Sequence, residues 1–171
     1  MKKYVYKLYS EIFPKLYEQE RDRIKTVLIN VMYIEQAGST AVPNLGGKGI
    51  IDIAIVVNKQ DLETASEQLQ KLGYEMGLSF STPERLYFTI ILPDPGERDR
   101  KYHVHLTYPE NNVWKDLIDF KDYLKNHPDV VKEYSEVKKQ AAIEANDNGE
   151  KYREIKKSLI VDIHSRMNEK Q

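Results

Sequence analysis

Cysteine is absent from the sequence, which excludes disulfides, thiolate metal sites and a cysteine nucleophile. Long apolar runs are absent too: the longest extends from Ile50 to Val57, is interrupted by Asp52, and is far too short to span a bilayer. The segment MKKYVYKLYSEIFPKL has no sustained apolar stretch and does not resemble a signal peptide. We therefore expect a cytoplasmic protein without a membrane partner.

The sequence also lacks an excess of either charge. Its 26 Lys and Arg residues are balanced by 27 Asp and Glu residues, which gives a formal net charge of -1. No overall field favours nucleic acid or an anionic membrane, so any anion site must be local. A chain of 171 residues has the usual size of one domain and can bury one substantial core. We predict a single domain over residues 1–171.

The first part of the sequence is expected to contain helices and strands in turn. Apolar side chains at helical spacing over residues 4–30 predict one or two amphipathic helices with an entry or break near Pro14. Residues 31–35 form a candidate strand, and the β-branched run IIDIAIVV is typical of a strand buried on both faces. Residues 61–72 carry leucines on one face and end before a glycine, which predicts a helix.

The remainder is expected to form three strands and then helices. Antiparallel strands are predicted over residues 74–80, 85–92 and 102–108, with the charged turn PDPGERDR before the last. Helices are predicted over residues 114–126, 128–145 and 150–167. Together these elements predict an α+β (α/β) domain, in which a mixed β-sheet is covered by helices mainly on one face and additional C-terminal helices follow.

The strongest chemical signal is a Gly-Ser turn that precedes a carboxylate in a buried strand. Gly38, Ser39 and Thr40 begin a Gly-rich loop that continues through Lys48 to Asp52. In such a turn backbone N–H groups and hydroxyls can approach a phosphate, and a carboxylate on a rigid strand can bind a divalent cation. The alternative is an ordinary loop with a solvated lysine, but burying an unpaired carboxylate costs several kcal/mol or forces its protonation. The sequence therefore predicts a phosphate and metal site.

Two histidines are further candidates for this site. His103 and His105 alternate with Val104 and Leu106, so both imidazoles should face one side of a strand while the apolar residues face the core. Imidazoles at this spacing can coordinate a metal, bind a phosphate or act as a general base. A half-exposed polar strand face is the alternative.

Arginines that stand beside predicted strand starts can hold phosphate in a bidentate manner, and Arg85 and Arg100 fit that description. The other cations of the charged turn are expected to be solvated. The segments KEYSEVKKQ and EKYREIKKS alternate charges along predicted helices and are expected to be solvated faces as well. No aromatic strand with basic neighbours is present, so a nucleic-acid partner is not indicated.

These residues closely resemble the signature of the GrpB family (UPF0157). The segment EQAGSTAVPNLGGKGIIDI matches that signature, GST-(A/S)-VPGL-(A/W)-AK followed by hydrophobic residues and Asp-Ile. The arginine-rich turn that leads into the His-x-His strand and the segment FKDYLKNHPDVVKEYSEVKKQAA are further matches, and together they cover most of the chain. The family is similar in turn to the nucleotidyltransferase fold, which has Gly-Ser, a spacer and an Asp-x-Asp/Glu pair on the next strand.

The resemblance implies a nucleotidyltransferase-like sheet and site. It implies catalytic roles for Asp52, His103 and His105, with Mg²⁺ as the cofactor held by Asp52. The residues implied at a nucleoside triphosphate are Gly38, Ser39, Thr40, Lys48, Arg85 and Arg100. A nucleotidyl group would pass to an acceptor that the sequence does not identify, and the sequence indicates no oligomeric state.

The second carboxylate of the nucleotidyltransferase pair is missing, because Ala54 occupies its position. Two carboxylates normally hold the two metal ions that align the attacking and leaving oxygens. Glu75, Glu84 or Asp94 could supply the missing ligand, and no spacing rule selects among them. Two functions therefore stay open: a nucleotidyltransferase, and a non-catalytic nucleotide-binding or interaction module of the same fold.

Overall fold

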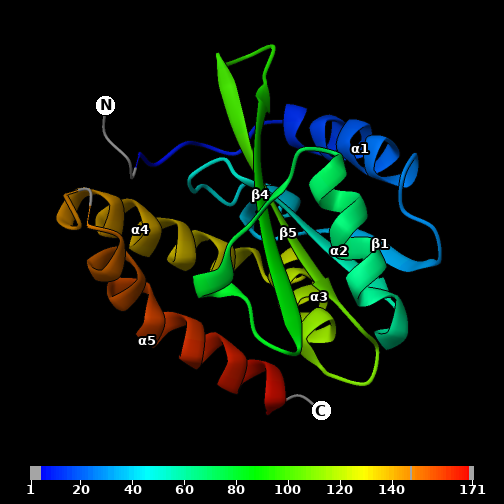
Figure 1. Ribbon diagram of the computed structural model, residues 1–171. Helices are drawn as coiled ribbons and strands as arrows, with labels where there is room; N and C mark the ends of the chain where they lie inside the picture. The colour runs from blue at the N-terminus through cyan, green and yellow to red at the C-terminus, as the bar shows by residue number, and fades with distance from the viewer. Residues whose placement is uncertain (1–4, 147, 170–171) are drawn as a thin grey trace.

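The computed structural model describes residues 5–146 and 148–169 (Figure 1). Five segments of this part of the chain pair into one sheet in the order β1-β2-β5-β4-β3. The strands are β1 (Val31–Ala37), β2 (Ile51–Val57), β3 (Glu75–Met76), β4 (Arg85–Pro93) and β5 (Asp99–Thr107). Strands β2 and β5 are parallel and the other neighbouring pairs are antiparallel, so the sheet is mixed as predicted.

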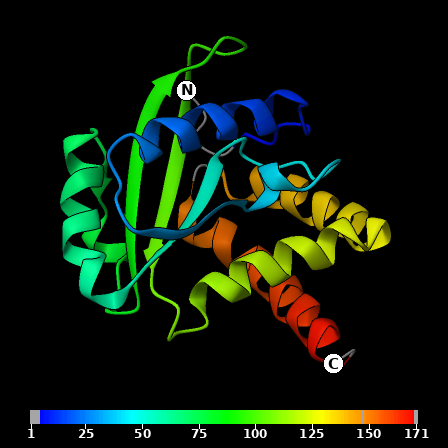
Figure 2. The same ribbon diagram turned by 90° about the vertical axis from the view of Figure 1, so that its right-hand side faces the viewer.

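Helices lie on both faces of this sheet (Figure 2). They are α1 (Ile12–Lys25), α2 (Leu62–Lys71), α3 (Val113–Lys125), α4 (Pro128–Glu144) and α5 (Gly149–Asn168). One face packs against α1 and α2, while α3 covers the other and α4 and α5 lie beyond it. The expectation that helices cover mainly one face is wrong, because α3 brings Trp114 and Ile118 onto the second face. Among the described helices, none is both long and apolar enough to cross a membrane.

The alternation of side chains along β2 and β5 places the polar residues. The three isoleucines of β2 are fully buried in the core against α1 and α2, so Asp52 and Ala54 face the other side of the sheet. On β5, Val104 is buried in the same core, and His103 and His105 share the face of Asp52. The prediction that both imidazoles face one side is confirmed.

Helix α1 begins near Pro14, one of the two outcomes predicted: Pro14 lies in its first turn, where the helix does not use the missing N–H. Two other predictions of secondary structure need correction. The strand predicted over residues 74–80 shortens to β3 and a 3₁₀ turn, because Ser81 Oγ accepts the backbone N–H of Tyr87 at 3.0 Å. Strand β5 begins at Asp99, earlier than predicted, because the charged turn continues the hairpin with β4.

Candidate functional site

Gly38 brings the backbone of the loop against the carboxylate of Asp52. Ala37, the last residue of β1, is the register partner of Asp52, and Gly38 then turns the chain into a 3₁₀ turn with φ 68°. A Cβ atom at Gly38 would lie 2.3 Å from Asp52 Oδ2. Glycine is therefore needed here both for the left-handed backbone and for the close approach.

Asp52 is held by two imidazoles. His103 is its register partner on the parallel strand β5, and His103 Nδ1 donates to Asp52 Oδ1 at 3.1 Å. His105 Nε2 lies 3.6 Å from the same oxygen. Burial by itself would raise the pKa of Asp52, but the hydrogen bonds and charges of the two histidines outweigh it and hold this pKa below its ordinary range. Asp52 is therefore a carboxylate at neutral pH.

The other nitrogen of each imidazole is left without a protein partner. His103 Nε2 and His105 Nδ1 are buried and make no hydrogen bond within the described residues. The ring of Tyr87 lies against both imidazoles, with centroids 5.1 and 5.5 Å away. An unpaired buried polar group costs about 1–3 kcal/mol.

Three lysines meet beside Asp52. A cavity of about 240 Å³ opens onto its carboxylate. The cavity is lined by Gly38, Ser39, Lys48, Ile50, Asp52, His103, Tyr134, Lys138, Tyr152 and Lys156. Lys138 Nζ lies 4.9 Å from the ring centroid of Tyr134, and Lys156 Nζ lies 4.7 Å from that of Tyr152. The site therefore concentrates positive charge next to one carboxylate.

The crowding of these lysines weakens their hold on protons. Burial, together with the charges of Lys156 and Lys48, lowers the pKa of Lys138 to about 7, although Asp52 acts in the opposite direction. Burial, together with Lys48 and Arg153, lowers the pKa of Lys156 to about 8. An anion in the cavity would favour the charged form of both lysines. The electrostatics of the cavity thus suit a phosphate ligand.

The sequence analysis missed Lys138 and Lys156, which it assigned to solvated faces. In the structure Lys138 is 5% exposed and Lys156 is half-buried. Each follows a buried tyrosine by four residues, and residues four apart lie on the same face of a helix. The signal that could have found them is a short repeat, Tyr-x-Glu-Val/Ile-Lys-Lys, at residues 134–139 and 152–157.

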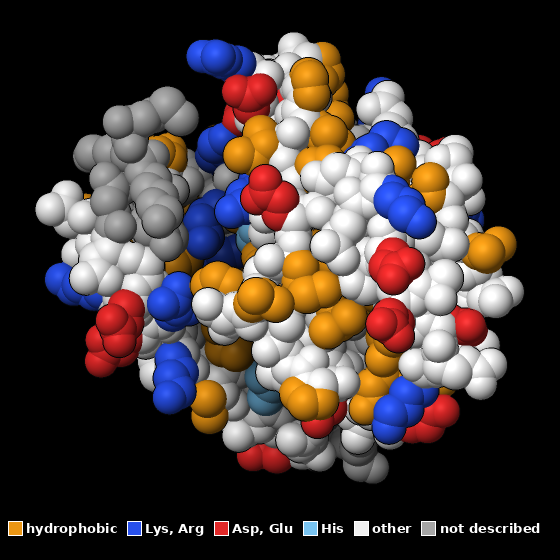
Figure 3. Space-filling model, viewed as in Figure 1, with side chains coloured by type: hydrophobic (Ala, Val, Ile, Leu, Met, Phe, Trp, Pro, Cys, Tyr) orange, Lys and Arg blue, Asp and Glu red, His pale blue; other side chains and the backbone are white. Residues whose placement is uncertain are grey.

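The structure brings most of the predicted residues together. Ser39 and Lys48 line the cavity, whereas the hydroxyl of Thr40 donates to the carbonyl of Ile50 at 2.9 Å and so closes the loop. Arg85 lies at a wider groove of about 990 Å³ that it shares with His103, His105, Lys48 and the N-terminal half of α5. Figure 3 shows lysine and arginine side chains gathered along a hollow between the sheet and the C-terminal helices.

Arg100 is not part of this site. It is 4% exposed on the opposite face of the sheet, where its guanidinium donates to Asp94 and, at 2.6 Å, to the carbonyl of Gly49. Arg100 is therefore a structural residue that ties the end of the Gly-rich loop to the β4–β5 hairpin. Its pairing with Asp94 also removes that residue as a second metal ligand. Glu75 and Glu84 line none of the hollows around Asp52 described here.

The donor set does not fit a two-metal centre. Ala54 is buried between Ala37 and Ile118 of α3, so core packing fills the position of the missing carboxylate. Within the described residues, no group of three or more histidine, aspartate or glutamate side chains is arranged to hold a metal ion. Asp52 alone fits one Mg²⁺, because Mg²⁺ is commonly held by one or two carboxylates together with phosphate oxygens and water.

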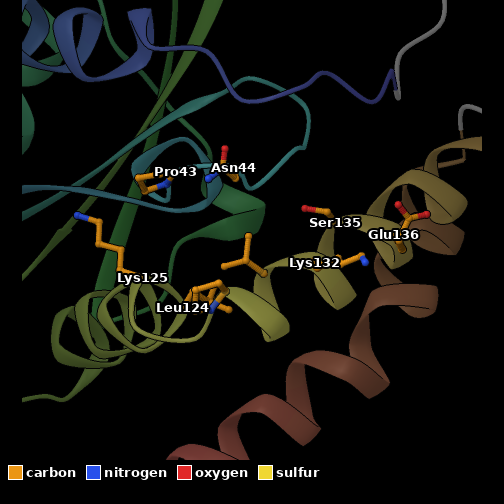
Figure 4. Close-up of a pocket in the computed structure, with 9 residues that line it drawn as sticks. Pro43, Asn44, Leu124, Lys125, Lys132, Ser135 and Glu136 are labelled. Atoms are coloured by element: carbon orange, nitrogen blue, oxygen red, sulfur yellow. The ribbon is translucent and has the colours of Figure 1, made fainter.

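A separate hollow lies behind the loop (Figure 4). It has a volume of about 600 Å³ and lies between Pro43 and Asn44 of the loop and helices α3 and α4. Ser135 of α4 lines it and accepts the backbone N–H of Gly46 at 3.3 Å. This contact ties the loop to the helix that carries Lys138.

The fold of this chain is shared by a polymerase of known structure. The structure of the Cid1 poly(U) polymerase with MgGTP bound superposes with a TM-score of 0.54 at 12% identity, over 76% of this chain and 44% of that one. A likeness at this identity establishes the shared fold, and the fold class predicted from the sequence is confirmed.

Within this fold the chain belongs to the GrpB family, as the sequence predicted. It matches the family described as GrpB protein over residues 6–166. The crystal structure of GrpB from Enterococcus faecalis superposes with a TM-score of 0.81 at 27% identity, over 97% of this chain and 98% of that one. The UPF0157 proteins YqkA of Bacillus subtilis and PA4798 of Pseudomonas aeruginosa are each 32% identical over 85% and 90% of this chain. The chain spans 41% and 63% of their respective lengths.

Proposed function

We propose that this chain binds a nucleoside triphosphate beside Asp52 and transfers its nucleotidyl group to an acceptor. The observation that carries the proposal is the cavity in which Lys48, Lys138 and Lys156 surround one carboxylate. Among the described residues that line it, lysines outnumber carboxylates, and a bound polyphosphate would hold Lys138 and Lys156 in their charged forms. The nucleotide-bound Cid1 structures, which hold MgGTP and a UTP analogue on the same fold, support the choice of ligand.

The roles of the residues follow from their chemistry. The backbone at Gly38 and the hydroxyl of Ser39 can donate to phosphate oxygens, and the lysines can neutralise charge that develops on the leaving pyrophosphate. Mg²⁺, when bound to Asp52 and the phosphates, would supply further neutralisation at the reacting phosphorus. His103 and His105 keep the carboxylate ionised and positioned.

A nucleotide-binding module without transfer chemistry is the second candidate. It is favoured by Ala54, whose packing against α3 leaves a single carboxylate where transferases of this fold use a pair. Both candidates require nucleotide binding, and only the transferase requires pyrophosphate release.

Calorimetry with ATP, GTP, CTP and UTP, each with and without Mg²⁺, tests binding. We expect Mg²⁺-dependent binding that Asp52→Asn abolishes and that Lys138→Met weakens by about tenfold or more, as loss of one charge-assisted hydrogen bond implies. Lys139→Met is the matched control, because Lys139 is the exposed neighbour on α4 and lies outside the cavity. Absence of binding for all four nucleotides would refute the proposal.

Pyrophosphate release distinguishes the two candidates once binding is established. The protein is incubated with the bound nucleotide and a panel of hydroxyl, amine and phosphate acceptors. Release that requires both an acceptor and Asp52 identifies a transferase. Binding without release across the panel favours the module.

A further inference from the structure

A second pocket meets the lysine cavity at Asp52. It has a volume of about 400 Å³ and lies between α3 and α5. It shares Gly38 and Asp52 with the cavity, and its other lining residues are His105, Val113, Asp116, Leu117, Phe120, Ile160 and His164. Most of this lining is apolar or aromatic, whereas the cavity is lined mainly by charged and polar groups. Two hollows of opposite character are therefore joined at one carboxylate.

Aromatic rings that contact one another form part of the wall of this pocket. Phe120 lies against His164, with ring centroids 5.1 Å apart and an interplanar angle of 30°. The edge of Phe120 also contacts Tyr134, with centroids 6.1 Å apart at 89°. Since Tyr134 lines the lysine cavity, the aromatic wall and the cavity share a fixed side chain. The pocket is pre-organised for a planar apolar group.

We propose that this pocket holds the nucleobase of the triphosphate, an inference that rests on the proposed function. In a nucleotide the α-phosphate lies between the nucleoside and the rest of the polyphosphate. Asp52 likewise lies between the apolar pocket and the basic cavity, so a nucleotide with its α-phosphate near Asp52 could place its base in one and its phosphates in the other. Phe120, Leu117 and Ile160 supply the apolar contact for the base. The exposed carboxylate of Asp116, at the edge, can accept a hydrogen bond from a ring N–H or amino group.

The acceptor is better accommodated in the groove of about 990 Å³ beside Arg85. This groove also reaches His103 and His105. Helix α5 lines it with charged side chains and with three apolar or aromatic ones, Tyr152, Ile160 and Val161. Its charged side chains suit a polar or anionic molecule. This division leaves the pocket between α3 and α5 for the nucleoside.

Inorganic tripolyphosphate carries the phosphates without a base. Comparing its affinity with that of a nucleotide therefore separates the contribution of the lysine cavity from that of the base pocket. Calorimetry of the full chain with Mg²⁺ should show ATP or GTP binding about tenfold tighter than tripolyphosphate, as one stacked base implies. Val113→Phe, which adds a ring inside the pocket, should abolish this difference and leave tripolyphosphate binding unchanged. Ile160→Phe should do the same from α5. Lys115→Phe, on the exposed side of α3, is the matched control.

The possible outcomes are distinct. Equal affinity for tripolyphosphate and all four nucleotides would overturn the base pocket while the phosphate site stands. Binding of neither would overturn the proposed function itself. If Val113→Phe and Ile160→Phe keep the wild-type melting temperature and the full nucleotide preference, the inference is refuted. Lys138→Met should lower the affinity for tripolyphosphate and for nucleotide by the same factor, because Lys138 lines the phosphate cavity.

Discussion

Lys138 and Lys156 belong to different helices and open onto one cavity, each above the ring of a tyrosine four residues earlier in the sequence. Within the described residues neither lysine forms an ion pair with Asp52, and the charges of Lys156 and Lys48 lower the pKa of Lys138. Burying these neighbouring ammonium groups is unfavourable when no anionic ligand is bound. Stability of the free protein should therefore depend on the charge of these lysines.

The first prediction concerns pH and Lys138. The folded-state pKa of about 7 lies below the ordinary lysine value of about 10.4. At pH values between these two, the unfolded chain holds a proton on Lys138 that the folded chain has released. The free energy of unfolding should consequently rise with pH above about 7. Lys138→Met should reduce this rise and stabilise the protein at neutral pH by about 1 kcal/mol or more.

Denaturant unfolding at a series of pH values measures this effect. Lys139→Met serves as the control and should leave the rise unchanged, because its side chain is exposed on the same helix. An equal slope in Lys138→Met and in the wild-type protein would contradict the prediction.

The second prediction concerns acid and Asp52. Its folded-state pKa is depressed, so its contribution to stability is fully present above the ordinary aspartate value of about 4 and is lost as the pH falls towards the depressed value. Asp52→Asn keeps an oxygen acceptor for His103 but removes the charge, and should make the acid loss of stability less steep. Asp119→Asn, on α3, is the control, and an unchanged acid limb in Asp52→Asn would contradict this account.

The third prediction compares two glycines with positive φ. Gly38→Ala should destabilise the protein by about 1–3 kcal/mol through backbone strain and should also displace the Asp52 carboxylate, which would abolish nucleotide binding. Gly73→Ala carries the same kind of strain at φ 99°, but its Cβ atom would meet only Ile90, at 3.4 Å. Melting curves and calorimetry should therefore show a loss of stability in both variants and a loss of binding in Gly38→Ala alone.

The fourth prediction tests the structural role of Arg100. Arg100→Met leaves Asp94 buried without its partner, which should cost about 3–5 kcal/mol. Arg98→Met is the control, because the Arg98 side chain is 96% exposed, and its stability should change by less than about 0.5 kcal/mol. At a temperature where Arg100→Met stays folded, its affinity for tripolyphosphate should equal that of the wild-type protein. A selective loss of binding there would return Arg100 to the site.

Local sequence was sufficient for the part of the site that the three neighbouring strands β1, β2 and β5 build. Gly38 follows Ala37, which pairs with Asp52 on the neighbouring strand. His103 and His105 share one face because side chains alternate along a strand. Short-range rules were enough to predict both relationships. The same alternation places Arg100 on the opposite face, since it lies three residues before His103. That error arose because the sequence analysis began the strand at residue 102, whereas β5 begins at Asp99.

Short-range rules could not place the lysines of α4 and α5. Which face of each helix turns inward depends on how the helices dock, and that is decided by apolar contacts among residues such as Leu124, Val131 and Ile163. Charge alternation along the sequence predicts a solvated face equally well for Lys138 and for its exposed neighbour Lys139. Only the docked arrangement distinguishes the two.

The contribution of Lys156 from α5 has a consequence for synthesis. Asp52, the loop and both histidines are translated well before α5, so a growing chain can complete the sheet while the cavity still lacks its last wall. Ligand would then bind fully only to molecules whose C-terminal helix has docked. Bound nucleotide would in that case stabilise molecules with a docked α5 over molecules that lack this helix.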